Sequence, residues 1–226
     1  MDFTLSPNQL QVQEKARAAA QAVREQARVL DRAGEFPGDI LAAWGREGFF
    51  GLALPEAYGG GGHDYVSYCL AQMELAQACP SSALLLHLNH TLVGQGLALF
   101  GSEELKRRYL PRVASGEVMA AFALTEPGAG SDPAALATTA RRDGDDWLLN
   151  GTKNFVTAGD RAAFGLVAAL TEPALGAKGI SVFLVDLAEA SGLTRGPVEE
   201  KVGLRGAPLN TLYFQEVRVP GENLEI

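Results

Sequence analysis

The pattern of apolar and polar residues changes its period near the middle of the chain. Before Gly116 the sequence is typical of helices, and after it short apolar runs alternate with turn residues in the manner of strands. The pattern therefore predicts an N-terminal all-α region, residues 1–117, followed by a β region, residues 118–226.

Start and stop signals divide the first half into five helices. Ser6, Pro7 and Gln9 form a capping box with proline at the first helical position. Gly48 stops the second helix, Asp64 can cap the third, and Glu103 and Glu104 in the first turn of the fifth favour the helix dipole. The expected helices cover residues 7 to about 30, 40 to about 47 and about 65–78, a stretch capped by Ser81 or Ser82 that ends near Gly101, and a stretch capped by Ser102 that ends before Gly116.

Short strands fill the second half. Asp143-Gly144 and Asn150-Gly151 lie between strand-like runs, and both dipeptides are typical of two-residue β-hairpin turns. Seven strands without intervening helices indicate a small antiparallel barrel or sandwich. The expected strands are residues 118–124, 136–142, 147–150, 153–157, 164–170, 180–185 and 209–219.

The composition is that of a globular protein and argues against nucleic-acid binding. A length of 226 residues favours two domains, and 47% hydrophobic with 20% charged residues provides an ample core. The net charge of -8 repels phosphodiester backbones. The short basic run 106–108 lies beside Glu103 and Glu104, so we expect no nucleic-acid partner.

No segment is typical of a targeting signal or a membrane span. The N-terminus lacks a basic start and a long apolar core, and the most apolar region, residues 83–100, is interrupted by four polar side chains. Cys69 and Cys79 are too few and too poorly spaced for a metal knuckle or a disulfide framework, so we expect buried thiols. These features predict a cytoplasmic protein.

Two segments carry candidate chemistry. Residues 122–132 join an apolar run to a loop with Gly128, Gly130 and the hydroxyl of Ser131. Glycines let backbone N–H groups turn inward, and converging N–H dipoles with a hydroxyl can cradle phosphate oxygens. A short Gly-x-Gly also serves as an ordinary turn, and no helix follows this one as in a dinucleotide-binding βαβ unit. The second segment is residues 153–159.

Together these segments resemble the flavin-binding signatures of the acyl-CoA dehydrogenase family. Similar strings occur along the chain at residues 55–60, 73–76, 101–106, 109–111, 116–117, 201–205 and 217–220. The resemblance implies an N-terminal helical domain, residues 1–117, and a middle β-barrel domain that binds FAD, residues 118–226. Family members continue from this point into a second helical domain.

The resemblance also implies roles for individual residues. The first segment lines the flavin, with Thr125 toward the pyrimidine side of the ring and Ser131 near the pyrophosphate and the thioester ligand. Thr157 matches the residue that directs a hydroxyl at flavin N5. Phe155 stands where many relatives carry tryptophan, so it keeps a stacking surface and loses the indole N–H. The candidate cofactor-binding residues are Phe122, Ala123, Leu124, Thr125, Gly130, Ser131, Phe155, Val156 and Thr157, and Ser131 is also a candidate substrate-binding residue.

Other polar residues receive no catalytic role. His87 and His90 are one helical turn apart, but no third ligand stands at suitable spacing for a metal site. Glu126 and Asp132 flank the glycine loop, yet family members carry such residues in addition to their catalytic base. That glutamate belongs to the C-terminal helical domain, so we name no general base in residues 1–226.

The implied function is that of an FAD-dependent acyl-CoA dehydrogenase, an oxidoreductase acting on CH–CH groups. Such an enzyme desaturates acyl-CoA thioesters between the α and β carbons and passes electrons to an electron-transfer flavoprotein, usually as a homo-oligomer. Because no base can be named, we expect this chain alone to be inactive. Two alternatives stay open: a flavin monooxygenase or oxidase on the same scaffold, and a non-catalytic subunit completed by a partner chain. The sequence does not predict the acyl-chain length.

Overall fold

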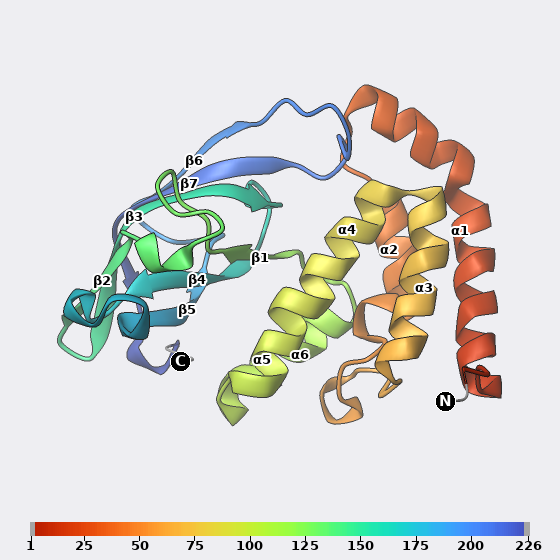
Figure 1. Ribbon diagram of the computed structural model, residues 1–226, viewed down its shortest axis with the longest axis horizontal. Helices are drawn as coiled ribbons and strands as arrows, with labels where there is room; N and C mark the ends of the chain where they lie inside the picture. Colours follow the sequence, from red (N-terminus) through yellow and green to blue (C-terminus); the bar gives the residue numbers. More distant parts are fainter. Residues whose placement is uncertain (1–2, 224–226) are drawn as a thin grey trace. The chain divides into compact units, whose positions relative to one another are not determined.

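The first helix begins where the sequence predicts. In the computed structural model, which describes residues 3–223, the Ser6 hydroxyl accepts the Gln9 N–H at 3.2 Å, and the Gln9 side chain accepts the Ser6 N–H at 2.9 Å. The capping box is therefore confirmed. The helices are α1 (Pro7–Ala33), α2 (Gly38–Arg46), α3 (Tyr65–Ala78), α4 (Pro80–His87), α5 (Gln95–Phe100) and α6 (Glu103–Ala114), with 3-10 turns at Phe49–Gly51 and Glu56–Tyr58 (Figure 1).

Helix α1 packs against α3 through a stripe of small buried residues. Val12, Ala16 and Ala20 are buried on one face of α1, and alanine lets the two helices approach closely. Arg17 on α1 forms an ion pair with Glu74 on α3, with the nitrogen and oxygen 2.9 Å apart. The stripe and the ion pair together hold the two helices side by side.

The apolar helical stretch that contains α4 differs from the prediction in two ways. Neither Ser81 nor Ser82 caps it, because α4 begins directly after Cys79 and both serines are buried inside the helix. A π-helical turn, Leu88–Gly94, then separates α4 from α5. Among the described residues, this stretch is the single helix that is long and apolar enough to cross a membrane, a test that the core helix of a globular protein also passes.

The two cysteines differ in their surroundings. Cys79 is buried, and its sulfur lies 3.0 Å from the Ser82 hydroxyl. Cys69 is exposed on α3, so the expectation that both thiols are buried is wrong. Helix α3 also exposes three large apolar side chains, Tyr65, Val66 and Met73. The positions of the apolar residues in its sequence therefore do not show which face of this helix is buried.

The β region forms a seven-stranded, curled sheet with strand order β1-β4-β2-β3-β7-β6, in which β5 pairs with the other side of β4. The sequence predicts a purely antiparallel sheet, and this prediction is wrong. The sheet is mixed, because β1 runs parallel to β4. The strands are β1 (Ala120–Ala123), β2 (Thr139–Asp143), β3 (Asp146–Thr157), β4 (Phe164–Leu170), β5 (Ile180–Asp186), β6 (Leu193–Val198) and β7 (Leu209–Val219), with 3-10 turns at Pro133–Ala135, Pro173–Gly179 and Gly221–Asn223.

One of the two expected hairpins is present. Strands β2 and β3 meet at a tight turn with Asp143 opposite Asp146. The expected turn at Asn150-Gly151 is wrong, because β3 runs through it as a single strand. Gly151 has φ +151°, and a Cβ there would lie 2.3 Å from the Thr138 hydroxyl. Glycine is therefore needed at position 151 because Thr138 lies so close to it, and not because the chain turns there.

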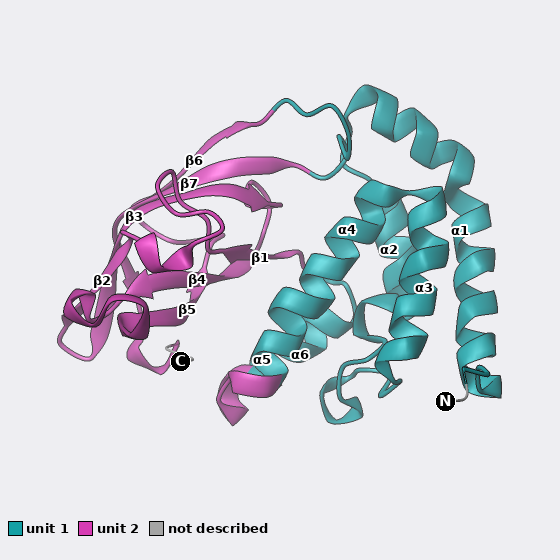
Figure 2. Ribbon diagram, in the orientation of Figure 1, with its two compact units in different colours: residues 1–98, 106–117, 200–207 teal, residues 99–105, 118–199, 208–226 magenta. Residues whose placement is uncertain are grey.

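The chain divides into two units that are interleaved in sequence. One comprises residues 1–98, 106–117 and 200–207, and the other residues 99–105, 118–199 and 208–226 (Figure 2). The domain boundary expected between residues 117 and 118 stays a prediction.

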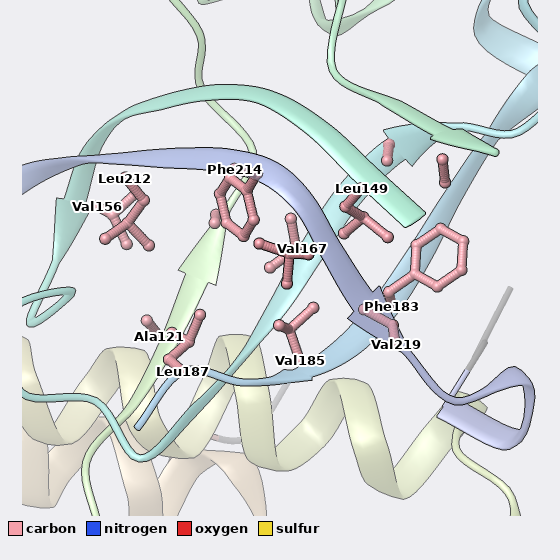
Figure 3. Close-up of a cluster of buried hydrophobic side chains, with 14 of the residues drawn as sticks. Ala121, Leu149, Val156, Val167, Phe183, Val185, Leu187, Leu212, Phe214 and Val219 are labelled. Carbon is pink, nitrogen blue, oxygen red and sulfur yellow. The ribbon is translucent and has the colours of Figure 1, made fainter. Parts of the chain in front are cut away.

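The core of the sheet unit lies inside the curled sheet. All seven residues of β4 are buried, and Val167 and Ala169 pack in the core with side chains from the strands around them. The residues labelled in Figure 3 are Ala121, Leu149, Val156, Val167, Phe183, Val185, Leu187, Leu212, Phe214 and Val219. This core anchors β1 and the C-terminal end of β3, the two strands that carry the candidate segments.

His90 is the buried histidine of the helical unit. Its Nδ1 lies 2.8 Å from the Phe50 carbonyl oxygen, and its ring stacks on Tyr68 with centroids 4.2 Å apart. Because a carbonyl only accepts hydrogen bonds, Nδ1 carries the proton. Nε2 has no partner in the part of the chain that the structure describes, so the ring is neutral. Burial lowers the pKa of His90 to about 4.

This buried neutral ring makes the stability of the chain depend on pH. The unfolded chain protonates His90 near its ordinary pKa of 6.5, whereas the folded chain protonates it only at about 4. The free energy of unfolding should therefore fall by up to about 3 kcal/mol as the pH drops through this window. Urea unfolding at several pH values measures this free energy. It should fall less with decreasing pH in His90→Gln than in the unmodified chain.

His63→Gln is the matched control, because His63 is only partly buried in the same unit. It should keep the pH dependence of the unmodified chain. The same slope in His90→Gln and in the unmodified chain would contradict a neutral, buried His90.

Candidate functional site

The structure brings the two candidate segments together within the sheet unit. Strand β1 ends at Ala123, and the chain continues beside β3. The backbone N–H of Asn154 in β3 donates to the Thr125 carbonyl oxygen at 2.7 Å. The backbone hydrogen bond between Asn154 and Thr125 therefore joins the chain just before the glycine loop to the chain just before Phe155.

A buried ion pair lies beneath this junction. Lys153 Nζ is 2.7 Å from Glu126 Oε1 and also donates to the Leu124 carbonyl oxygen at 3.0 Å. The side chains of Lys153 and Glu126 are 0% and 5% exposed. The Glu126 carboxylate also accepts the backbone N–H groups of Ala137 at 2.6 Å and Thr138 at 3.0 Å. One lysine and one glutamate thus connect three separate stretches of the chain.

The electrostatics of the pair favour its charged form. Burial raises the pKa of Glu126, but the hydrogen bonds from Lys153 and from the backbone N–H groups outweigh burial and hold this pKa below its usual value. Burial lowers the pKa of Lys153, and the neighbouring carboxylate opposes that effect. Both partners of the Lys153 amine only accept hydrogen bonds, which favours the ammonium form. We therefore describe the pair as ionised.

Strand β3 bulges directly after this pair. Its register with β7 shifts between Lys153 and Val156, and Phe155 within the bulge has φ +56°. A left-handed backbone is unusual for a bulky residue and costs about 1–3 kcal/mol. The Phe155 side chain is 58% exposed, whereas Val156 is buried in the core. The bulge therefore directs an aromatic ring toward solvent.

The candidate residues differ in what they can present to a ligand. The side chains of Ala123 and Val156 are buried in the core, so only their main-chain atoms can contact a ligand. Gly130, Ser131 and Phe155 are exposed. The half-buried candidates are Phe122, Leu124, Thr125 and Thr157.

Neither glycine of the loop is required by the chain itself. Gly128 and Gly130 have no positive φ, and a Cβ built at either would meet no atom within 4 Å. Pro127 and Gly128 form the centre of a tight turn in which Glu126 and Ala129 exchange both backbone hydrogen bonds. The expectation that this loop cradles phosphate oxygens stays a prediction. The structure leaves open space beside the main chain at both glycines.

The acidic residues of the loop are engaged in structural contacts. Glu126 is paired with Lys153, and the Asp132 carboxylate accepts the Ala134 N–H at 3.0 Å at the start of a 3-10 turn. Within residues 3–223, no group of three or more His, Cys, Asp and Glu could hold a metal ion. Lys153 received no role from the sequence. Its burial has no clear signal in the sequence, because its neighbours in β3 include the polar residues Thr152 and Asn154.

Comparison with known proteins identifies the family. The model of the acyl-CoA dehydrogenase N-terminal domain matches residues 6–117, and the model of the acyl-CoA dehydrogenase middle domain matches residues 121–217. The chain belongs to the acyl-CoA dehydrogenase family. The resemblance is therefore confirmed, and so is the expected fold class of a helical region followed by a curled β-sheet, with a mixed sheet in place of the antiparallel one.

Individual relatives agree with this assignment. A probable acyl-CoA dehydrogenase of Mycobacterium leprae is 43% identical over 195 residues, which are 86% of this chain and 50% of that protein. Butyryl-CoA dehydrogenase from Megasphaera elsdenii superposes with a TM-score of 0.95 at 32% identity, covering 100% of this chain and 60% of that one. A structure described as the electron transferring flavoprotein of Acidaminococcus fermentans, in a study of flavin-based electron bifurcation, superposes with a TM-score of 0.96 at 36% identity over 100% and 59%. The chain thus spans about half the length of the curated acyl-CoA dehydrogenase that it matches.

The left-handed backbone at Phe155 gives a test that needs no ligand. Phe155→Ala and Phe155→Gly both remove the exposed ring, but only glycine adopts a positive φ without steric cost. The glycine variant should therefore be more stable than the alanine variant by about 1 kcal/mol. Denaturant unfolding of the two variants measures the difference, and an alanine variant of greater stability would contradict a bulge with this conformation.

Proposed function

We propose that this chain is the flavin-binding portion of an FAD-dependent enzyme that desaturates acyl-CoA thioesters between the α and β carbons. One observation carries the proposal. The bulge that exposes Phe155 is hydrogen-bonded to a loop whose glycines leave open space beside the main chain. A planar ring against Phe155 and a phosphate group against the loop would use both features.

The residues present fit the parts of FAD. Gly130 and Ser131 are exposed and make no hydrogen bond to another described residue, so their N–H groups and the Ser131 hydroxyl are free for pyrophosphate oxygens. Phe155 offers an apolar surface for the ring, and the half-buried Thr125 and Thr157 offer hydroxyls at its edge. When bound, FAD supplies the acceptor for the hydride that leaves the β carbon.

The proposal assigns the general base to no residue of this chain. A base must take the α proton, and its carboxylate must be free to reach the substrate. The Glu126 carboxylate already accepts hydrogen bonds from Lys153, Ala137 and Thr138. Holding FAD and the thioester is the part of the reaction that these residues can perform, and the activity of the chain alone should be negligible.

The proposed electron acceptor of the whole protein is an electron-transfer flavoprotein. The support is that a chain similar to this one occurs in a structure described as the electron transferring flavoprotein of Acidaminococcus fermentans. The acyl-CoA substrate is supported by the likeness to butyryl-CoA dehydrogenase. A cytoplasmic location and a homo-oligomeric whole protein complete the proposal.

The fit of FAD can be tested at Gly130. Because the space beside it is open, Gly130→Ala should leave the ligand-free melting temperature unchanged or slightly higher, with a gain of at most about 1 kcal/mol. The added methyl group should weaken FAD binding about tenfold or more, since it stands where the cofactor approaches the main chain. Equilibrium dialysis against FAD measures the affinity.

Gly203→Ala is the matched control, because Gly203 also has open space around its Cβ position and no positive φ, but lies outside the candidate segments. It should leave FAD affinity unchanged. Equal affinities of Gly130→Ala and the unmodified chain would show that FAD does not approach the main chain there.

The function itself is tested with the purified 226-residue chain. We expect weak but measurable FAD binding, seen as a rise in melting temperature, and negligible dye reduction with acyl-CoA thioesters. No rise at saturating FAD would contradict the flavin site, and full turnover would show that the chain does contain its own base. Rapid oxygen consumption by the reduced flavin without enoyl-CoA product would indicate an oxidase or monooxygenase instead.

A further inference from the structure

We propose that the buried Glu126–Lys153 pair is the positioning element of the flavin site, and that it sets the spacing between the glycine loop and the Phe155 bulge. The inference rests on the proposed function, because it concerns residues that act through that site. Neither side chain need touch the cofactor. Both are nearly or fully buried, and their contacts are with other parts of the chain.

Lys153 lies in β3 directly before the bulge. It is the last residue in regular register with β7 before the bulge, opposite Leu212. Its ammonium group donates to Leu124, and the N–H of the next residue, Asn154, donates to Thr125. Two successive residues of β3 are therefore tied to two successive residues of the first candidate segment, and Phe155 follows directly.

The Glu126 carboxylate binds both Lys153 and the backbone beyond the glycine loop. Glu126 directly precedes the glycine loop, and Ala137 and Thr138 follow the loop in the chain. The Glu126 carboxylate accepts the backbone N–H groups of both later residues. The carboxylate thus closes the base of the loop that contains Gly130 and Ser131. Lys153 joins this closed loop to the bulge, so one ion pair fixes both halves of the site.

The charge of the buried pair has a consequence for the precision of the site. Burying two charges costs free energy, and apolar residues of similar volume often give equal or greater stability. Stability alone therefore does not explain an ion pair at this place. Directional hydrogen bonds from a charged donor fix atomic positions within the narrow tolerance that a binding site needs.

The test separates position from stability with a double variant. In Glu126→Gln with Lys153→Met, a glutamine oxygen in the place of Oε2 can still accept the backbone N–H groups of Ala137 at 2.6 Å and Thr138 at 3.3 Å. Methionine fills the space of the lysine stem. The ligand-free melting temperature should stay close to that of the unmodified chain. The dissociation constant for FAD, measured by equilibrium dialysis, should rise about 10- to 100-fold.

Two further measurements keep the result specific. Hydrogen exchange at the Asn154 amide should speed up in the double variant, because its bond to Thr125 is no longer held. Val219→Ala, at the far end of β7 in the same core, should lower the melting temperature and leave FAD affinity unchanged. The single variant Lys153→Met leaves a buried carboxylate without a counter-charge and should lose both stability and affinity.

The outcomes distinguish this inference from the proposed function. If the unmodified chain does not bind FAD, the proposed function is overturned, and this inference with it. If the unmodified chain binds FAD and the double variant binds it equally well, the inference alone is overturned. Weaker binding in the double variant, at an unchanged melting temperature, supports the positioning role.

Discussion

The organisation of the sheet unit around its candidate site depends on one buried ion pair. The 2.7 Å contact between Lys153 and Glu126 joins β3 to the chain beyond β1, and the same carboxylate binds the residues that lead into β2. Removing one partner of such a pair commonly costs about 3–5 kcal/mol, because the other charge is left buried. The pair therefore imposes a strict requirement: these three stretches must meet in one arrangement, or a charge remains unpaired in the core.

Departures from ordinary local preferences gather around this pair. A lysine is fully buried in a strand, a phenylalanine adopts a left-handed backbone with an exposed ring, and Gly130 occupies a position that the chain itself does not reserve for glycine. Each departure is unfavourable or unexplained when the chain is considered alone. The core beneath, with Val156 and Leu212, supplies the packing that holds the bulge in place. Such a concentration is typical of functional sites, where local rules give way to the geometry of a ligand.

Features encoded by neighbouring residues were predictable from the sequence. The capping box at Ser6 and the turn at Asp143-Gly144 follow from residues within a few positions of one another, and the structure has both. Features that depend on distant contacts were not. Gly151 is glycine because Thr138 approaches it, the parallel pairing of β1 with β4 requires knowledge of the whole sheet, and β6 contains Gly196 and Pro197, which disfavour strands. The candidate segments were found by resemblance, whereas the ion pair that joins them is a contact between residues far apart in the sequence.

The central claim is that the glycine loop and the Phe155 bulge form one flavin site. Hydrogen exchange of backbone amides, with and without saturating FAD, tests it most directly. On adding FAD, we predict slower exchange at Gly130 and Ser131 in the loop and at Phe155 to Thr157 in β3. Exchange at the β2–β3 turn around Gly144 should change little. Unchanged exchange in both segments, in a chain that demonstrably binds FAD, would contradict it.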